Sequence, residues 1–215
     1  MSVARGDARS WTRCWLTIPR TARRSAVTES SDRPDSRETE HAFLDANVIR
    51  GQLTTDVLLS LAEQDVFQPR WTRKVIDEMR RNRPPGVSEK AIARRIAMMN
   101  GAFEDAMTEA PPQELQDEMQ ADRKDRHVLA GALHSRSDFL VTDNVKDFFP
   151  PSTGPHAMRV EQLNEVLIRK LNEDPQRVQA GLQEMVNHNR REPRSMQALI
   201  DTMAEGQELR GLLRG

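Results

Sequence analysis

The sequence predicts an α/β fold: a Rossmann-like parallel sheet flanked by helices, followed by a C-terminal helical extension. Short apolar runs alternate with amphipathic helical patterns between residues 41 and 160. Acidic residues follow the ends of several runs, and residues 161–215 have helical periodicity without a strand pattern. Such alternation is typical of a doubly wound parallel sheet, whose ligand crevice lies outside the carboxyl ends of the strands.

The composition is that of one ordinary domain with extensions. Among 215 residues, 32 are basic and 33 acidic, so composition alone does not nominate nucleic acid as a partner. The single cysteine, Cys14, excludes an intramolecular disulfide framework. No apolar run approaches the ~20 residues that span a bilayer. We therefore expect a cytoplasmic protein with no membrane partner.

Three regions are distinguished along the chain. Residues 1–40 lack apolar periodicity and are rich in Arg and Ser. An Arg-rich, acid-poor start can mimic an organellar targeting segment, but we favour a disordered tail. Residues 41–160 are predicted to form the sheet domain, and residues 161–215 a helical extension too small to be expected to fold without docking on it.

The elements of the sheet domain are predicted in order from apolar pattern and punctuation. The run 41–44 is a buried strand that ends at Asp45, and residues 54–64 have helical spacing. A short strand over 66–69 should end at Pro69, which has no backbone donor. The further predictions are a helix capped by Thr72 to Arg81, a helix from Ser88 to Phe103, a strand over 106–108, a helix over 123–135, a strand over 138–142 and an edge strand over 157–160.

Acids that lie far apart in sequence stand at the predicted strand ends or on the helices beside them. Asp45 directly follows the first strand; a metal ligand oriented by Asn47 and an Asx turn or helix cap are equally open interpretations. Asp77 and Glu78 point about 100° apart on their helix, so only one can face the crevice. Asp122 and Asp125 have the spacing of a capping pair.

If these carboxylates converge, their repulsion must be relieved. Two unit charges 4 Å apart repel by about 4 kcal/mol at an effective dielectric of ~20. Such a cluster takes up protons, or binds a cation such as Mg²⁺ or Mn²⁺ and becomes a hydrolytic site. Zinc is disfavoured because His127 and His134 are seven residues apart with no cysteine nearby.

Four segments in order carry a family resemblance. They are Phe-Leu-Asp-Ala-Asn-Val from Phe43, Ile-Asp-Glu-Met-Arg-Arg-Asn from Ile76, Asp-Arg-Lys-Asp-Arg-His-Val-Leu-Ala-Gly-Ala from Asp122 and Phe-Leu-Val-Thr-Asp-Asn-Val-Lys-Asp-Phe-Phe-Pro from Phe139. Over roughly residues 41–160 the chain resembles a PIN domain, closest to the branch related to VapC-type toxins of bacterial toxin–antitoxin pairs. The resemblance implies a Rossmann-like sheet, dependence on Mg²⁺ or Mn²⁺, and endoribonuclease chemistry on single strands.

The resemblance also assigns residues. It places the metal-binding acids on Asp45, Glu78 and Asp125, favours Glu78 over Asp77, and leaves Asp122 as the cap. The family's fourth acid falls on Asn144, a departure that Asp143 or Asp147 would compensate. We take Asp45, Glu78, Asp125 and Asp143 as the predicted catalytic residues, with Asn47, Thr142 and Asn144 in support.

The leading hypothesis is a metal-dependent endoribonuclease that acts as the toxin of a type II toxin–antitoxin pair. Nine basic residues against three acids between Gln68 and Ile96 offer phosphate contacts, foremost Arg73, Arg80 and Arg81. The expected partners are an RNA substrate, an antitoxin protein and a second copy of the chain. Two alternatives stay open: a non-catalytic PIN-like module that binds RNA or protein, motivated by Asn144, and a haloacid-dehalogenase-like phosphatase, which Asn47 disfavours.

Overall fold

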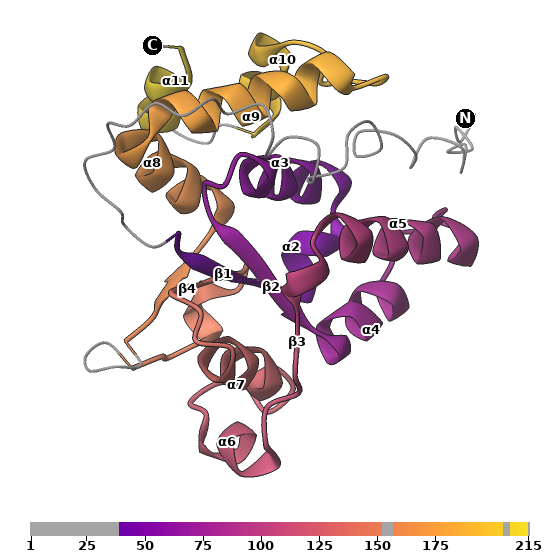
Figure 1. The fold of residues 1–215 in the computed structure, drawn as a ribbon, viewed down its shortest axis with the longest axis vertical. Coiled ribbons are helices and arrows are strands. Elements are labelled where there is room, and N and C mark those ends of the chain that lie inside the picture. The colour runs from indigo at the N-terminus through magenta and orange to yellow at the C-terminus, as the bar shows by residue number, and fades with distance from the viewer. Residues whose placement is uncertain (1–38, 152–156, 204–206, 215) are drawn as a thin grey trace, which may run out of the picture.

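The computed structural model describes residues 39–151, 157–203 and 207–214 (Figure 1). A sheet of five strands, in which every pairing is parallel, is flanked by helices, so the predicted fold class is confirmed. The strands are β1 (His41–Leu44), β2 (Gln68–Thr72), β3 (Met107–Thr108), β4 (Phe139–Val141) and β5 (Arg159–Glu161). Apart from residues 39 and 40, the predicted disordered tail lies outside the described residues, as do residues 152–156.

The strand order β3-β2-β1-β4-β5 puts β1 at the centre of the sheet. The chain moves outward from β1 through β2 to β3, then returns to the other side of β1 for β4 and β5. The direction therefore reverses between β1 and β4, which pair in register from Ala42 opposite Phe139 to Leu44 opposite Val141. In an open parallel sheet such a switch point opens a crevice at the carboxyl ends of the strands.

The helices follow the predicted caps closely at two places. Thr72 Oγ1 accepts a hydrogen bond from the Val75 amide, and Ser88 Oγ accepts one from the Ala91 amide. None of the described helices is long and apolar enough to cross a membrane. Within the sheet domain the helices are α2 (Ala46–Arg50), α3 (Gln52–Glu63), α4 (Arg73–Arg81), α5 (Glu89–Ala102), α6 (Gln113–Glu118) and α7 (Arg126–His134).

The prediction that Pro69 ends the second strand is wrong, because the proline lies inside β2. The Gln68 amide donates a hydrogen bond to the Glu40 carbonyl, so the backbone groups of Gln68 point toward β1. Those of the next residue, Pro69, point toward the opposite edge of β2. On that edge β3 pairs only from Trp71 onward. The missing donor of Pro69 therefore removes no bond from the sheet.

The start of α7 is also later than predicted. The helix begins at Arg126, and the Asp122 carbonyl accepts bonds from the amides of Asp125 and Arg126 in a preceding turn. Asp122 Oδ1 accepts from the Lys124 amide, while Asp125 occupies the N-cap position with no side-chain cap bond. Asp122 thus stabilises the turn before the helix, and the predicted capping pair is not formed. The short helices α2 and α6 were not predicted either.

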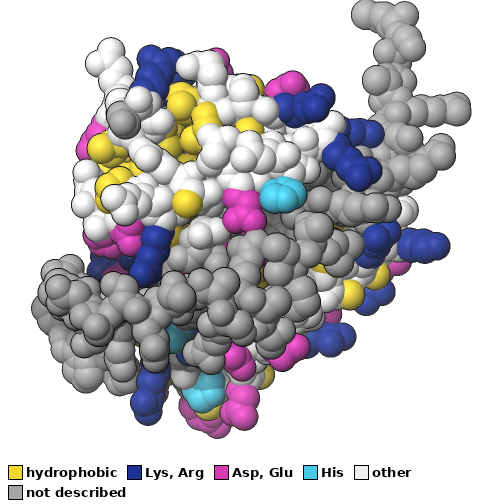
Figure 2. Space-filling model, turned by 45° about the horizontal axis from the view of Figure 1, so that its top comes forward, with side chains coloured by type: hydrophobic (Ala, Val, Ile, Leu, Met, Phe, Trp, Pro, Cys, Tyr) yellow, Lys and Arg dark blue, Asp and Glu magenta, His cyan; other side chains and the backbone are white. Residues whose placement is uncertain are grey.

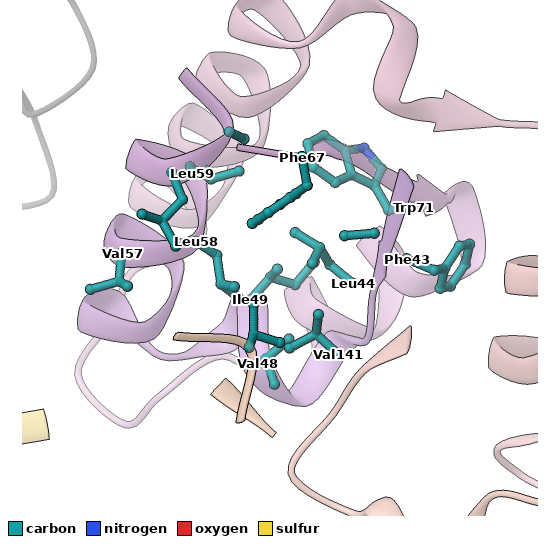
Figure 3. Packing of buried hydrophobic residues seen from close by; sticks show 14 of the residues in the cluster. Phe43, Leu44, Val48, Ile49, Val57, Leu58, Leu59, Phe67, Trp71 and Val141 are labelled. Carbon is teal, nitrogen blue, oxygen red and sulfur yellow. The ribbon is translucent and has the colours of Figure 1, made fainter. Parts of the chain in front are cut away.

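Helices cover both faces of the sheet. On one face α7 lies unusually close, because a Cβ built on Gly131 would stand 2.8 Å from Phe43 Cζ and 3.2 Å from Thr72 Cγ2. On the other face α3 packs on the sheet, where Leu58 and Leu44 lie in one apolar cluster. Phe43 belongs to the same cluster, but its side chain points to the side of the strand opposite Leu44 (Figure 3). The site described below therefore rests on strands packed from both sides.

The C-terminal helices dock on this domain and share its core. They are α8 (Leu163–Glu173), α9 (Pro175–His188), α10 (Met196–Met203) and α11 (Gln207–Arg214). Helix α9 runs beside α3 (Figure 1), and a Cβ on Gly181 would lie 2.9 Å from the Ser60 carbonyl oxygen. Valines and leucines of α8 and α9 join the same hydrophobic cluster as the sheet.

An ion-pair cluster fixes α8 to the edge of the sheet. Arg169 contacts Glu40, Glu161 of β5 and Glu173, and its guanidinium lies 4.6 Å from the centroid of the Phe139 ring. Burial alone would raise the pKa of Glu40, but hydrogen bonds from Lys170 and Arg159 outweigh it and lower the pKa to about 2. In Figure 2 the described side chains along the right-hand side of the face are mostly basic, whereas acidic side chains lie mainly toward its centre and lower edge.

Candidate metal centre

Asp45 stands at the carboxyl end of the central strand. Its amide donates to the Val141 carbonyl, which continues the β1–β4 ladder by one residue. The side chain is 7% exposed, and Oδ1 accepts a hydrogen bond of 2.6 Å from the Ala46 amide at the start of α2. Asp45 is therefore the helix cap that the sequence allowed, with its second oxygen, Oδ2, directed to the neighbouring strand end.

Thr142, just past β4, links the groups at the switch point. Its hydroxyl donates to Asp45 Oδ2 at 2.8 Å and accepts from Asn47 Nδ2 at 3.0 Å. Asn47 Oδ1 in turn accepts from the Asp143 amide at 3.3 Å. These bonds hold the Asp45 carboxylate in one orientation, as outer partners do for metal ligands.

Glu78 comes to this region from α4. Its Oε1 lies 2.9 Å from His127 Nε2 on α7 and 3.8 Å from an Arg81 guanidinium nitrogen. Asp77, the rejected alternative, instead pairs with Arg73 along the exposed side of the helix. Of the two adjacent acids, Glu78 is the one directed toward α7.

Asp125 reaches the site from the turn that opens α7. Burial raises its pKa, and the charges of Asp122 and Glu78 add to the rise while Lys124 opposes it. Its Oδ2 is buried and has no hydrogen-bond partner in the described part of the chain. Burying a carboxylate oxygen without a hydrogen-bond donor costs free energy, and a bound cation would offset that cost.

The electrostatics show that the three acids are neighbours. The pKa of Asp45 is raised to about 6, chiefly by burial and in smaller part by the negative charges of Asp125 and Glu78, which together outweigh the hydrogen bonds from Thr142 and Ala46. Even so, no three His, Cys, Asp or Glu side chains of the described residues are placed to enclose a metal ion as they stand. The acids approach one another without forming a closed cage.

The segment that holds these acids matches a known family. The family model of the PIN domain matches residues 41–146, from the start of β1 to just beyond β4. Over residues 41–146 the chain is similar to PIN domains. Neither a curated protein nor a solved structure matched the chain. PIN domains are generally nuclease domains, and they typically use divalent metal ions.

The acids of this PIN domain fit a hard divalent cation. Asp45, Glu78 and Asp125 offer carboxylate oxygens, the ligands that Mg²⁺ and Mn²⁺ prefer. Asp125 Oδ2 has no hydrogen-bond partner among the described residues, and burial with the nearby charges of Asp125 and Glu78 raises the pKa of Asp45, so a cation would stabilise the ionised form of both acids. No thiolate and no pair of histidines takes part, so zinc is not favoured.

The stretch predicted to complete the site lies at its margin. Asp143 and Asn144 are both exposed. Asp143 makes its described bonds through its backbone, to Asn47 Oδ1 and from Gln162 Nε2, and the Asn144 amide donates to Thr142 Oγ1 at 3.2 Å. The roles of Asp143, Asn144 and Asp147 stay predictions.

The basic residues proposed for substrate contact are exposed but partly neutralised. Arg73 pairs with Asp77, Arg80 pairs with Glu89, and Arg81 lies beside Glu78. Among the three, Arg81 alone contacts one of the candidate metal-binding acids. Residue His127 was not assigned to the site from the sequence; its position two residues after Asp125 was the available signal.

Proposed function

We propose that this PIN domain is a Mg²⁺- or Mn²⁺-dependent endoribonuclease in which Asp45, Glu78 and Asp125 hold the cation. The proposal rests chiefly on the position of Asp45 at the carboxyl end of β1, beside the β1–β4 switch point, with Asp125 and Glu78 near enough for their charges to raise its pKa. A bound cation would lower the pKa of an attacking water and neutralise charge on the scissile phosphate.

The chain's own groups supply orientation. The Thr142 hydroxyl and the Ala46 amide fix the two oxygens of Asp45. Asp125 presents a buried oxygen without a protein donor. Arg81, exposed and within 3.8 Å of Glu78, stands where a phosphate could approach the acids, and Asp143 at the rim is the proposed further catalytic group.

A cleavage assay tests the activity. A 5′-labelled RNA with single-stranded loops is incubated with Mg²⁺ or Mn²⁺, with a chelator arm and a single-stranded DNA arm of the same sequence. Asp45→Asn removes a negative charge from the site. Asp201→Asn makes the same substitution at an exposed position on α10 and serves as the control. We expect cleavage of RNA by wild type and Asp201→Asn only, abolished by chelation. Cleavage that survives both Asp45→Asn and chelation contradicts the proposal, and RNA binding without cation binding favours a non-catalytic module.

We further propose that the enzyme is a toxin of the VapC-like branch that acts in the cytoplasm with a neutralising antitoxin and a second copy of itself. The support is the order and spacing of the four segments quoted above. Induced expression should arrest growth, and co-expression of a small neighbouring reading frame that encodes a DNA-binding protein should restore it. Growth unaffected by wild-type protein that is active in the cleavage assay contradicts the toxin role. Light scattering on the purified protein measures self-association.

A further inference from the structure

A buried histidine lies against Glu78. His127, in the first turn of α7, is 2% exposed, and its Nε2 stands 2.9 Å from Glu78 Oε1. The other contact of Glu78, with Arg81, is longer at 3.8 Å and involves a side chain that is 67% exposed. The histidine is therefore the firmer of the two partners.

The direction of this hydrogen bond follows from the acid. An ionised carboxylate only accepts, so His127 Nε2 donates and a neutral ring carries its lone pair on Nδ1. Nδ1 is buried and has no hydrogen-bond partner among the residues that the structure describes. Burying an unsatisfied polar atom costs free energy that an apolar side chain would avoid. The bond to Glu78 is the described interaction that offsets this cost.

The opening of α7 thus serves two acids at once. Asp125 stands at the N-cap position of the helix, and His127 follows two residues later. Glu78 comes from α4, so its hydrogen bond with His127 fixes the position of the Glu78 carboxylate relative to that of Asp125. Both described contacts of Glu78 end on Oε1, which leaves Oε2 as the oxygen for a cation or its water.

We propose that His127 is a positioning residue that orients the Glu78 carboxylate for the divalent cation. This inference rests on the proposed function, because it takes Glu78 as one of the cation's ligands. The alternative is a purely structural role, in which the Glu78–His127 pair only holds α4 against α7. In that case its loss would change the stability of the fold but leave the cation affinity of the folded protein unchanged.

Two pairs of variants separate these roles. His127→Gln places an amide donor near the position of Nε2, whereas His127→Leu fills similar space without a donor. His127→Asn has the same amide on a shorter stem that does not reach Glu78, so the Gln–Asn comparison remains informative if the Leu variant fails to fold. His134→Leu, at the exposed end of the same helix, is the control.

The measurement is Mn²⁺ binding by titration calorimetry, with thermal unfolding in a chelator as the check on folding. We expect affinity about 10- to 100-fold weaker for the Leu and Asn variants, as for other lost supports of metal ligands. The Gln variant should recover most of it, and His134→Leu should match wild type. The same order should appear in kcat for RNA, with KM little changed.

The outcomes keep the two proposals apart. If wild type binds Mn²⁺ and the folded Leu and Asn variants bind it equally well, the positioning role is wrong while the proposed function stands. A Gln variant as weak as Asn also overturns it, because the donor would then not matter. If wild type binds no Mn²⁺, both proposals fall.

Discussion

The Thr142 hydroxyl donates a hydrogen bond of 2.8 Å to Asp45 Oδ2 across 97 residues of sequence. The two residues follow β4 and β1, the strands that flank the switch point of the sheet. This bond ties the most buried acid of the site to the neighbouring strand end. The orientation of the Asp45 carboxylate, a proposed metal ligand, therefore depends on the pairing of β4 beside β1.

Thr142→Val should weaken both the fold and the site. Valine has the shape of threonine but leaves Asp45 Oδ2, Asn47 Nδ2 and the Asn144 amide without the hydroxyl. A hydrogen bond to a charged group contributes about 1.5–3 kcal/mol, so we expect that loss in the free energy of unfolding at pH 8. Mn²⁺ affinity should fall roughly 10- to 100-fold. Thr142→Ser keeps the hydroxyl and should resemble wild type; equal behaviour of the two variants would refute the role of the bond.

The raised pKa of Asp45 predicts that, in the presence of a chelator, this residue makes the folded protein less stable as the pH rises. The folded-state pKa of about 6 exceeds the ordinary 3.8, so the folded protein holds a proton that the unfolded chain has released between these values. Its stabilising effect is present at acid pH and is lost as pH rises from about 4 to about 6. The shift corresponds to roughly 3 kcal/mol.

Denaturant titrations of wild type and Asp45→Asn from pH 4 to 8 measure this effect. Relative to the variant, wild type should lose stability across the window and stay level above it. Saturating Mg²⁺ should restore wild type alone, because ligands that bind only the folded state stabilise it. Parallel pH curves for the two proteins would show that Asp45 keeps an ordinary pKa.

Gly131→Ala should displace α7 from the sheet. The new Cβ would lie 2.8 Å from Phe43 Cζ, closer than real Cβ contacts allow. Overpacking of this kind costs about 1–3 kcal/mol, whereas alanine in an open helix gains up to ~1 kcal/mol over glycine. Gly101→Ala on α5 meets nothing within 4 Å and is the matched control. Thermal unfolding should separate the two, and a Gly131→Ala protein as stable as the control would contradict the close packing.

Gly181→Ala should loosen the C-terminal helices. Its Cβ would stand 2.9 Å from the Ser60 carbonyl of α3, a backbone atom that cannot rotate away. We expect about 1–3 kcal/mol lower stability and faster proteolysis within α9. Gly211→Ala on α11 has open space around it and should be neutral or stabilising. Unchanged protease resistance of Gly181→Ala would argue against docking of α9 on α3.

Local chemistry in the sequence predicts the elements that carry the site. The apolar run before Asp45 and the caps Thr72 and Ser88 suffice to place β1, α4 and α5 within a residue or two. Pro69 misleads because its tolerance depends on where β3 starts to pair, which is a property of the sheet and not of the segment. The start of α7 misleads because the turn at Asp122 uses the same residue types as a helix cap.

For the site, the sequence indicates the candidate acids but not the contacts that hold them. The sequence and its family resemblance select Asp45, Glu78 and Asp125, whose roles stay predictions; in the structure, the charges of Glu78 and Asp125 help to raise the pKa of Asp45. The sequence does not reveal His127, because the partner of that ring is 49 residues away on another helix. The hydroxyl of Thr142 likewise gains its importance only when β4 is paired beside β1. Both contacts depend on strand and helix packing over long sequence distances.

The most direct test of the account is the crystal structure of the protein soaked in Mn²⁺, with the anomalous signal of the ion recorded. We predict an anomalous peak bounded by the carboxylates of Asp45, Glu78 and Asp125, at ligand distances of roughly 2.0–2.3 Å. The peak should be absent in Asp45→Asn. An ion-free site between these three acids at saturating Mn²⁺, in crystals of protein that cleaves RNA, would contradict the central claim.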